Sequence, residues 1–86
     1  MLKIYGSMQC PGCVQCREEL DNAGVEYEFC DITQNLALLK EFLVIRDGSA
    51  LFDDARKTGM AGIPCIITED GSITFDWDVY VGQAEA

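Results

Sequence analysis

Apolar and polar residues change their spacing several times along the chain. Residues 2–6, LKIYG, form a short β-prone run that ends at Gly6 and is followed by a small polar loop. Small or apolar residues then recur every three or four positions, with charged residues between them, as far as Gly24. The recurring set is Cys13, Cys16, Leu20 and Ala23. The pattern predicts a strand and then an amphipathic helix that ends at Gly24.

Residues 25–32 alternate in polarity and are rich in β-branched and aromatic residues, which predicts a second strand directly after the helix. Strand, helix and strand within about thirty residues predict a right-handed βαβ unit with parallel strands. A second helical pattern over residues 36–46 ends at Gly48, and either Thr33 or Asn35 is suited to cap its start.

The last third of the chain changes its period again. Ser49 is suited to cap a shorter helical segment that ends near Gly59. Residues 65–68 and 72–75 are β-prone and flank the turn signal EDG, so they predict an antiparallel hairpin. The tail, residues 76–86, fits either one short helical turn or a frayed end.

Length and charge restrict the function. The 86 residues are enough for a single domain spanning residues 1–86. The net charge of −9, from 15 acids and six bases, repels nucleic-acid phosphates and anionic membranes, so neither is expected as a partner. No apolar stretch approaches the ~20 residues that span a bilayer, and the amino terminus has no long apolar leader. We therefore expect a cytoplasmic protein.

The five cysteines are an odd number, which favours reduced thiols over a fully paired secreted framework. No histidine is present, so the commonest general base and metal ligand is missing. Any reactive thiol must therefore be activated in another way.

The CPGC run at residues 10–13 lies between the first predicted strand and the first predicted helix. Pro11 suits the first helical turn, so Cys10 becomes the residue that caps the helix, where the helix dipole stabilises a thiolate. Cys13 falls one turn later on the same side, and its Cα is expected about 5–6 Å from that of Cys10, within disulfide reach. We predict Cys10 as the attacking thiol and Cys13 as the resolving thiol of a redox pair.

A CxxC pair also occurs in zinc and iron–sulfur sites, so a metal site is the competing interpretation. The other cysteines, at positions 16, 30 and 65, are not paired at metal-ligand spacing, which favours the redox pair and no bound metal. Cys16 is expected to be a small core residue. The alternative is a second thiol that bonds to Cys13 or completes a CxxCxxC metal site. Cys30 and Cys65 are expected to be buried.

The opening IYGSMQCPGC and the later GIPCI, residues 62–66, resemble the CPYC opening and the TVP segment of glutaredoxins, which belong to the thioredoxin superfamily. The resemblance implies a thioredoxin-like α/β fold, a four-stranded mixed sheet with helices on both faces. It also implies that Pro64 follows a cis peptide bond and lies against the redox pair. Pro11, Gly12, Ile63 and Pro64 would contact the substrate, Ile63 through its backbone.

The function that the resemblance implies is a thiol–disulfide oxidoreductase that reduces mixed disulfides of proteins or of glutathione. Its partners would be disulfide-containing proteins, and it would act as a monomer without a tightly bound cofactor. Glutathione is the candidate co-substrate. Gly12 stands where the family has tyrosine, so the family's redox potential does not carry over to this chain.

A second departure concerns glutathione recognition. The family has a Gly-Gly-acid-acid turn after the last strand, and this chain has TFDWD, residues 74–78, in its place. Within this stretch, Asp76 or Asp78 is the residue expected to meet the amino group of glutathione. No lysine directly precedes Cys10, and the nearest cations are expected to be Arg17 together with either Arg46 or Lys57. These departures favour an alternative in which a flavoprotein reductase of the thioredoxin type supplies the electrons. A carrier of an iron–sulfur cluster or metal is the alternative from another class.

The remaining conspicuous residues have structural explanations. The acidic pairs at residues 18–19 and 53–54 are expected to be solvated helix faces, because adjacent helical positions point apart. Trp77 is expected to cover the core.

Overall fold

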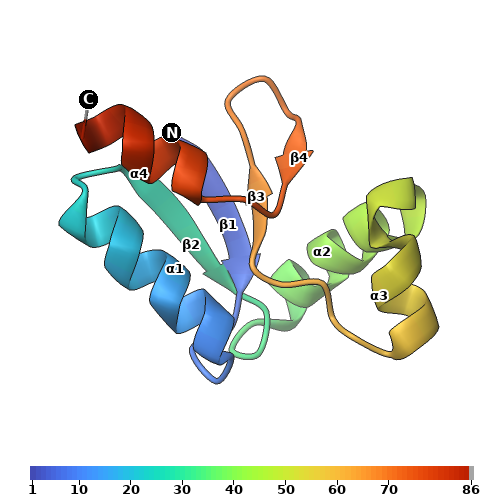
Figure 1. The fold of residues 1–86 in the computed structure, drawn as a ribbon. Coiled ribbons are helices and arrows are strands. Elements are labelled where there is room, and N and C mark those ends of the chain that lie inside the picture. The colour runs from blue at the N-terminus through green and yellow to red at the C-terminus, as the bar shows by residue number, and fades with distance from the viewer. Residues whose placement is uncertain (86) are drawn as a thin grey trace.

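The computed structural model describes residues 1–85, in which helices cover both faces of a four-stranded sheet (Figure 1). The elements in chain order are β1 Leu2–Gly6, α1 Pro11–Asn22, β2 Tyr27–Asp31, α2 Leu36–Gly48, the short 3₁₀ helix Ala50–Phe52, α3 Asp53–Thr58, β3 Cys65–Ile67, β4 Ile73–Thr74 and α4 Asp78–Glu85. This is the thioredoxin-like α/β fold that the sequence predicts.

The sheet is mixed, with strand order β2-β1-β3-β4. β1 pairs in parallel with β2 and antiparallel with β3, and β3 and β4 form the predicted hairpin. Tyr5 lies opposite Cys30 on one side and opposite Cys65 on the other. The end of β1 therefore lies beside the start of β3. The loop that carries Cys10 and the segment before Cys65 meet at this end of the two central strands.

The helix ends follow the predicted capping residues. Cys10 is the N-cap of α1 by position, in extended conformation and without a capping hydrogen bond from its side chain, and Pro11 is the first helical residue. At the other end Gly24 has a φ of 74°, and the Val25 N–H donates to the Leu20 carbonyl at 3.0 Å. Of the two candidate caps for α2, Asn35 is the one used, since its side chain accepts from two backbone N–H groups of the first turn.

Two apolar clusters cover the two faces of the sheet. The side chains of β1 alternate, so Ile4 faces one cluster and Tyr5 the other. The buried residues on the α1 and α4 side are Leu2, Ile4, Cys16, Leu20 and Ile66. Those on the α2 and α3 side are Tyr5, Cys30, Ile32, Phe42, Phe52 and Cys65. Both faces of the sheet therefore carry buried side chains, and Figure 1 shows the helices that cover them.

The structure corrects two expectations. The tail is neither a single turn nor a frayed end, because α4 runs for eight residues and packs with Trp77 on the α1 side. Glu19 is not part of a fully solvated face either, since it is half-buried and accepts a hydrogen bond from the Trp77 indole N–H at 2.9 Å. Trp77 covers the core as predicted. Among residues 1–85, no helix is both long and apolar enough to cross a bilayer.

Candidate active site

The two thiols of the CPGC run differ in their burial. Cys10 is partly exposed at the start of α1, whereas Cys13 is fully buried. A Cβ added to Gly6 would lie 2.8 Å from the Cys13 sulfur, so this sulfur packs directly against the backbone of β1. The pair is therefore accessible to another molecule through Cys10.

The buried environment of Cys13 favours the protonated thiol. Burial raises the pKa of the Cys13 thiol to about 12, because the charged thiolate loses solvation there. The backbone N–H of Ser7 opposes this increase by donating a hydrogen bond to the sulfur, and the neighbouring Cys10 adds to it. Cys13 is therefore protonated at neutral pH.

Pro64 lies beside the accessible thiol. The peptide bond between Ile63 and Pro64 is cis, which confirms the expectation drawn from the GIPCI segment. A Cβ added to Gly12 would lie 3.8 Å from the Cys10 sulfur and 3.9 Å from Cδ of Pro64. Cys10, Gly12 and Pro64 therefore border one small region, where the exposed ring of Pro11 follows Cys10 along the chain.

The segment before Pro64 is held from two sides. The Arg46 guanidinium donates to the carbonyl oxygens of Met60 and Ala61 at 2.7 and 3.1 Å. Gly62 has a φ of 88°, and a Cβ there would lie 2.7 Å from the ring of buried Phe52. These contacts fix the backbone that leads into Ile63 and Pro64.

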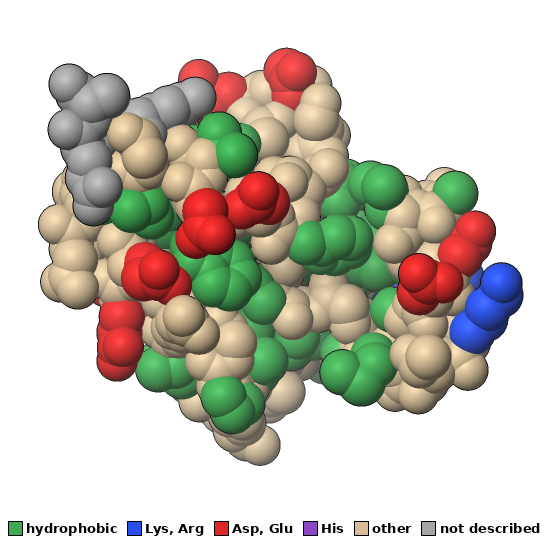
Figure 2. Space-filling model, viewed as in Figure 1, with side chains coloured by type: hydrophobic (Ala, Val, Ile, Leu, Met, Phe, Trp, Pro, Cys, Tyr) green, Lys and Arg blue, Asp and Glu red, His purple; other side chains and the backbone are tan. Residues whose placement is uncertain are grey.

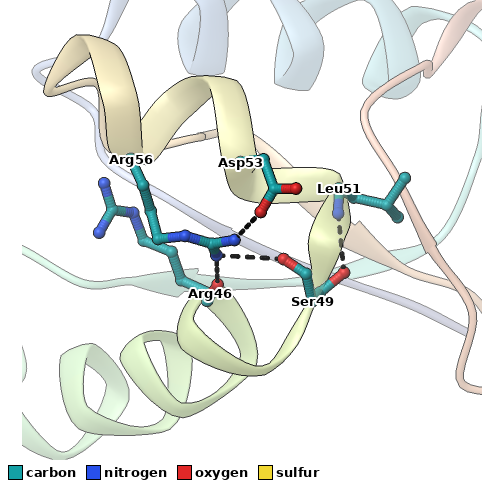
Figure 3. Close-up of polar contacts among 5 residues, drawn as sticks. All are labelled: Arg46, Ser49, Leu51, Asp53 and Arg56. Atoms are coloured by element: carbon teal, nitrogen blue, oxygen red, sulfur yellow. Dashed lines mark hydrogen bonds and ion pairs between the residues drawn. The ribbon is translucent and has the colours of Figure 1, made fainter.

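A second arginine fixes the junction between α2 and α3. Arg56 reaches back from α3 to the carbonyl oxygens of Arg46 and Ser49, and it forms an ion pair with Asp53 (Figure 3). In the same junction Ser49 accepts from the Leu51 N–H at 3.3 Å, as the predicted cap. The backbone of Arg46 is therefore held in place by the side chain of Arg56.

Comparison with known proteins places the chain in a family. A family model for glutaredoxin matches residues 2–71, which is most of the chain. The chain belongs to the glutaredoxin family. It is 37% identical over 73 residues to an uncharacterised protein of Haemophilus influenzae, and the match covers 85% of each chain. No solved structure matches. Membership supports a general role in thiol oxidoreduction.

Both arginines expected near the motif, Arg17 and Arg46, already have partners within the chain. The Arg17 guanidinium lies 4.4 Å from the centre of the Phe29 ring, donates to the Tyr27 hydroxyl at 3.2 Å and approaches the Met8 sulfur at 3.1 Å. Arg46 holds the segment before Pro64. Lys57 is exposed on α3.

Asp76 and Asp78, the candidates for the glutathione amino group, are exposed where β4 leads into α4. The Asp78 N–H donates to the Asp76 carboxylate at 2.9 Å, so Asp76 caps the start of α4. Where the family resemblance led us to expect an acidic turn, the two aspartates of this chain lie at the start of α4.

The other three thiols are buried in the two apolar clusters, as expected. Burial raises the pKa of Cys16 and of Cys65 to about 11, and it raises the pKa of Cys30 as well. No group of three Cys, Asp or Glu side chains in residues 1–85 is arranged to hold a metal ion.

Sequence reasoning did not find the polar contacts beneath the Cys10 loop. Ser7 is buried, its hydroxyl lies 3.0 Å from that of Thr33, and its carbonyl accepts the Cys10 N–H at 3.1 Å. The available signals were a serine and an Asp-x-Thr sequence, each placed directly after a strand, where such side chains bond to the backbone two residues on.

Proposed function

We propose that this protein is a dithiol thiol–disulfide oxidoreductase in which Cys10 attacks the substrate and Cys13 resolves the mixed disulfide. The observation that carries the proposal is the unequal burial of the two thiols, one partly exposed at the start of α1 and the other enclosed behind it. This inequality suits an order of reaction in which the exposed thiol meets the substrate first.

The reaction has two exchange steps. In the first, the Cys10 thiolate attacks one sulfur of the substrate disulfide, a mixed disulfide forms, and one substrate thiolate leaves and takes up a proton. In the second, Cys13 loses its proton and attacks the Cys10 sulfur, the bond between Cys10 and the substrate breaks, and the second substrate thiol leaves. Two electrons pass from the dithiol to the substrate, and an external reductant restores the pair.

The proposed contact surface for the substrate consists of Pro11, Gly12, Ile63 and Pro64, of which Pro11 is exposed, Gly12 and Ile63 are partly exposed, and Pro64 is buried. Its support is the position of Gly12 between the Cys10 sulfur and the Pro64 ring, with space there for an ordinary van der Waals contact. The two hydrogen bonds from Arg46 keep the backbone before Ile63 in one place. A disulfide with a small apolar or peptide neighbour fits such a surface.

Two electron donors are compatible with this chemistry. Glutathione is the donor that family membership suggests. A flavoprotein reductase is the second candidate, and the internal partners of Arg17 and Arg46 favour it, because these guanidinium groups already donate within the chain. A net charge of −9 also disfavours an anionic tripeptide.

The test uses intact-mass spectrometry after exposure to oxidised glutathione. We expect the Cys13→Ser variant to accumulate one glutathione adduct on Cys10, and the parent protein to form an internal disulfide instead. The Cys16→Ser variant is the matched control, because it removes a buried thiol of the same helix and should behave as the parent. An adduct that persists in the Cys10→Ser variant would contradict the assignment of Cys10.

A parallel assay separates the donors. Parent protein oxidised at the dithiol is offered either reduced glutathione or a thioredoxin-type flavoprotein reductase with NADPH. Reduction by the reductase alone would select the second donor. The oxidoreductase proposal fails if Cys13→Ser forms no adduct, the parent forms no internal disulfide and neither donor reduces the parent. A carrier of an iron–sulfur cluster then becomes the leading hypothesis.

A further inference from the structure

A chain of hydrogen bonds runs beneath the loop that carries Cys10. The Gln9 N–H donates to the Ser7 hydroxyl oxygen at 3.1 Å. The Ser7 hydroxyl lies 3.0 Å from the hydroxyl of Thr33, and the Thr33 hydroxyl lies 2.5 Å from the Asp31 carboxylate. The chain therefore connects the loop after β1 to the end of β2.

The direction of each bond follows from the groups themselves. Asp31 is ionised near neutral pH, since hydrogen bonds from Thr33 lower its pKa, and an ionised carboxylate can only accept. The Thr33 hydroxyl must therefore donate to Asp31 and accept from Ser7. The Ser7 oxygen is left to accept the Gln9 N–H, so every donor in the chain points towards Asp31.

Ser7 also contacts both cysteines through its backbone. Its carbonyl oxygen accepts the Cys10 N–H at 3.1 Å. The Cys13 sulfur packs against the end of β1, where a Cβ at Gly6 would lie 2.8 Å from it, and the Ser7 N–H there lowers the pKa of the Cys13 thiol against the effect of burial. Ser7 is only 2% exposed, and it is the one buried polar or charged residue in the described part of the chain. A buried hydroxyl that lost its partner would have little access to replacement water.

We propose that Ser7 is a positioning residue for the resolving step, with its hydroxyl, anchored through Thr33 to Asp31, holding the backbone that directs an N–H at the Cys13 sulfur. This inference rests on the proposed dithiol function. It assigns to Ser7 a task that neither cysteine performs.

The resolving step is the one that this N–H serves. Cys13 must become a thiolate before it can attack the mixed disulfide, and this charge develops in a site closed to solvent. A hydrogen bond to a charged sulfur in such a site stabilises the ionised form more than it stabilises the thiol. The first step forms no charge on Cys13, so the loss of this hydrogen bond should slow the second step selectively.

The experiment follows the two steps separately with dithiodipyridine. Cys10 attacks this neutral disulfide and releases one thiopyridone, and Cys13 then displaces the second thiopyridone as the internal disulfide forms. Samples quenched in acid at successive times and examined by intact mass give the formation and the decay of the Cys10 adduct. In the Ser7→Ala variant we expect the decay to slow roughly three- to tenfold and the formation to change less than about twofold.

Thr33 provides a second approach, because its side chain is exposed and touches neither cysteine. The Thr33→Val variant removes the link to Asp31 while it keeps the shape of the side chain, and it should slow the decay as Ser7→Ala does. Thr33→Ser restores the hydroxyl and should recover the rate relative to Thr33→Val. This pair decides the question even if Ser7→Ala does not fold.

Thr68 is the matched control. Its hydroxyl donates to the Asp70 carboxylate two residues away, the same kind of pair as Thr33 with Asp31, but in the turn between β3 and β4. Thr68→Val should leave the ratio of the two rates unchanged. Equal slowing of both steps in Ser7→Ala, or a similar effect of Thr68→Val, would overturn the inference. If the parent itself shows no second step, the dithiol function fails instead.

Discussion

The contact between Gly6 and Cys13 determines how closely the Cys13 thiol approaches the sheet. A Cβ at position 6 would lie 2.8 Å from the Cys13 sulfur and 3.1 Å from the Phe29 ring, both below ordinary contact distance. Gly6→Ala should therefore lower the free energy of unfolding by about 1–3 kcal/mol, as overpacking does in a closed core. Urea unfolding followed by circular dichroism measures this loss, and the decay of the Cys10 adduct should slow with it.

Gly48 offers the comparison for that substitution. It lies at the end of α2, and a Cβ there would meet no atom within 4 Å. Gly48→Ala should be neutral or slightly stabilising, because alanine loses less conformational freedom in a helix. An equal loss in both variants would mean that the contact with Cys13 is not the cause.

At the residue scale, the positions of Cys10 and Pro64 were easier to predict from the sequence than the polar contacts around them. The cysteine spacing and the position of Pro11 were sufficient to place Cys10 at the helix start, and the family resemblance was sufficient for the cis bond before Pro64. The bond between Ser7 and Thr33 was not predictable, since it joins residues 26 apart in sequence. It exists because Gly6 and Asp31 are neighbours in the parallel pairing of β1 and β2.

At the scale of the elements, α2 holds the segment that leads into β3. Arg46 of α2 donates to the carbonyl oxygens of Met60 and Ala61, ahead of β3. Arg46→Ala removes both bonds, and at this partly exposed site we expect a loss of about 1 kcal/mol in the local opening free energy. Hydrogen exchange should show faster exchange of the amides in residues 60–63, and the KM for a peptide disulfide should rise more than kcat falls.

Lys40→Ala is the matched variant for Arg46→Ala. Lys40 is an exposed cation of the same helix, so the variant changes the net charge and the helix surface equally. Its amides in residues 60–63 should exchange as in the parent. Comparable acceleration in both variants would attribute the effect to charge rather than to the two carbonyl contacts.

The elements that the sequence described poorly are those whose partners are distant. The predicted hairpin strands are shorter in the structure, Cys65–Ile67 and Ile73–Thr74, because their pairing is limited to a few residues. α4 looked marginal because an isolated short helix is unstable in water. Its stability comes from packing on the α1 side, where Trp77 also donates to Glu19, and no local pattern reports that contact.

For the whole molecule, the buried thiols make stability sensitive to alkaline pH. The folded-state pKa is about 12 for Cys13 and about 11 for Cys16 and Cys65, whereas an unfolded thiol titrates near ~8.5. The buried thiols stabilise the folded state fully below about pH 8.5, where they are protonated in both states. As the pH rises towards the folded-state pKa values, the unfolded thiols ionise first and the free energy of unfolding falls. One pH unit above the unfolded value, each thiol costs about 1.4 kcal/mol.

Urea unfolding of the reduced protein between about pH 7.5 and about pH 9.5 checks this sign, in a range below the usual titration of tyrosine. Stability should fall as the pH rises, and Cys65→Ala should flatten the slope because one titrating thiol is gone. A slope that stays the same in Cys65→Ala would show that other groups cause the loss.

The net charge of −9 should also select among substrates. On the face drawn in Figure 2, acidic side chains lie among apolar ones, and the blue of basic side chains is visible only in a small patch at the end formed by α3, next to acidic side chains. A field of one sign attracts ligands of opposite charge and repels those of like charge, and salt screens both effects. A cationic disulfide should therefore approach Cys10 faster than an anionic one at low ionic strength.

The Cys13→Ser variant isolates this first encounter, because the resolving step cannot follow. We expect its reaction with cystamine, a cation, to slow as salt is added, and its reaction with oxidised glutathione, an anion, to accelerate. A neutral hydroxyethyl disulfide should show little change and corrects for the intrinsic reactivity of the thiol. Glutathione that instead reacted more slowly in high salt would mean that a local cationic site outweighs the net charge. That result would return glutathione to the position of preferred donor, and Lys57, which is exposed on α3, would then be the first cation to replace.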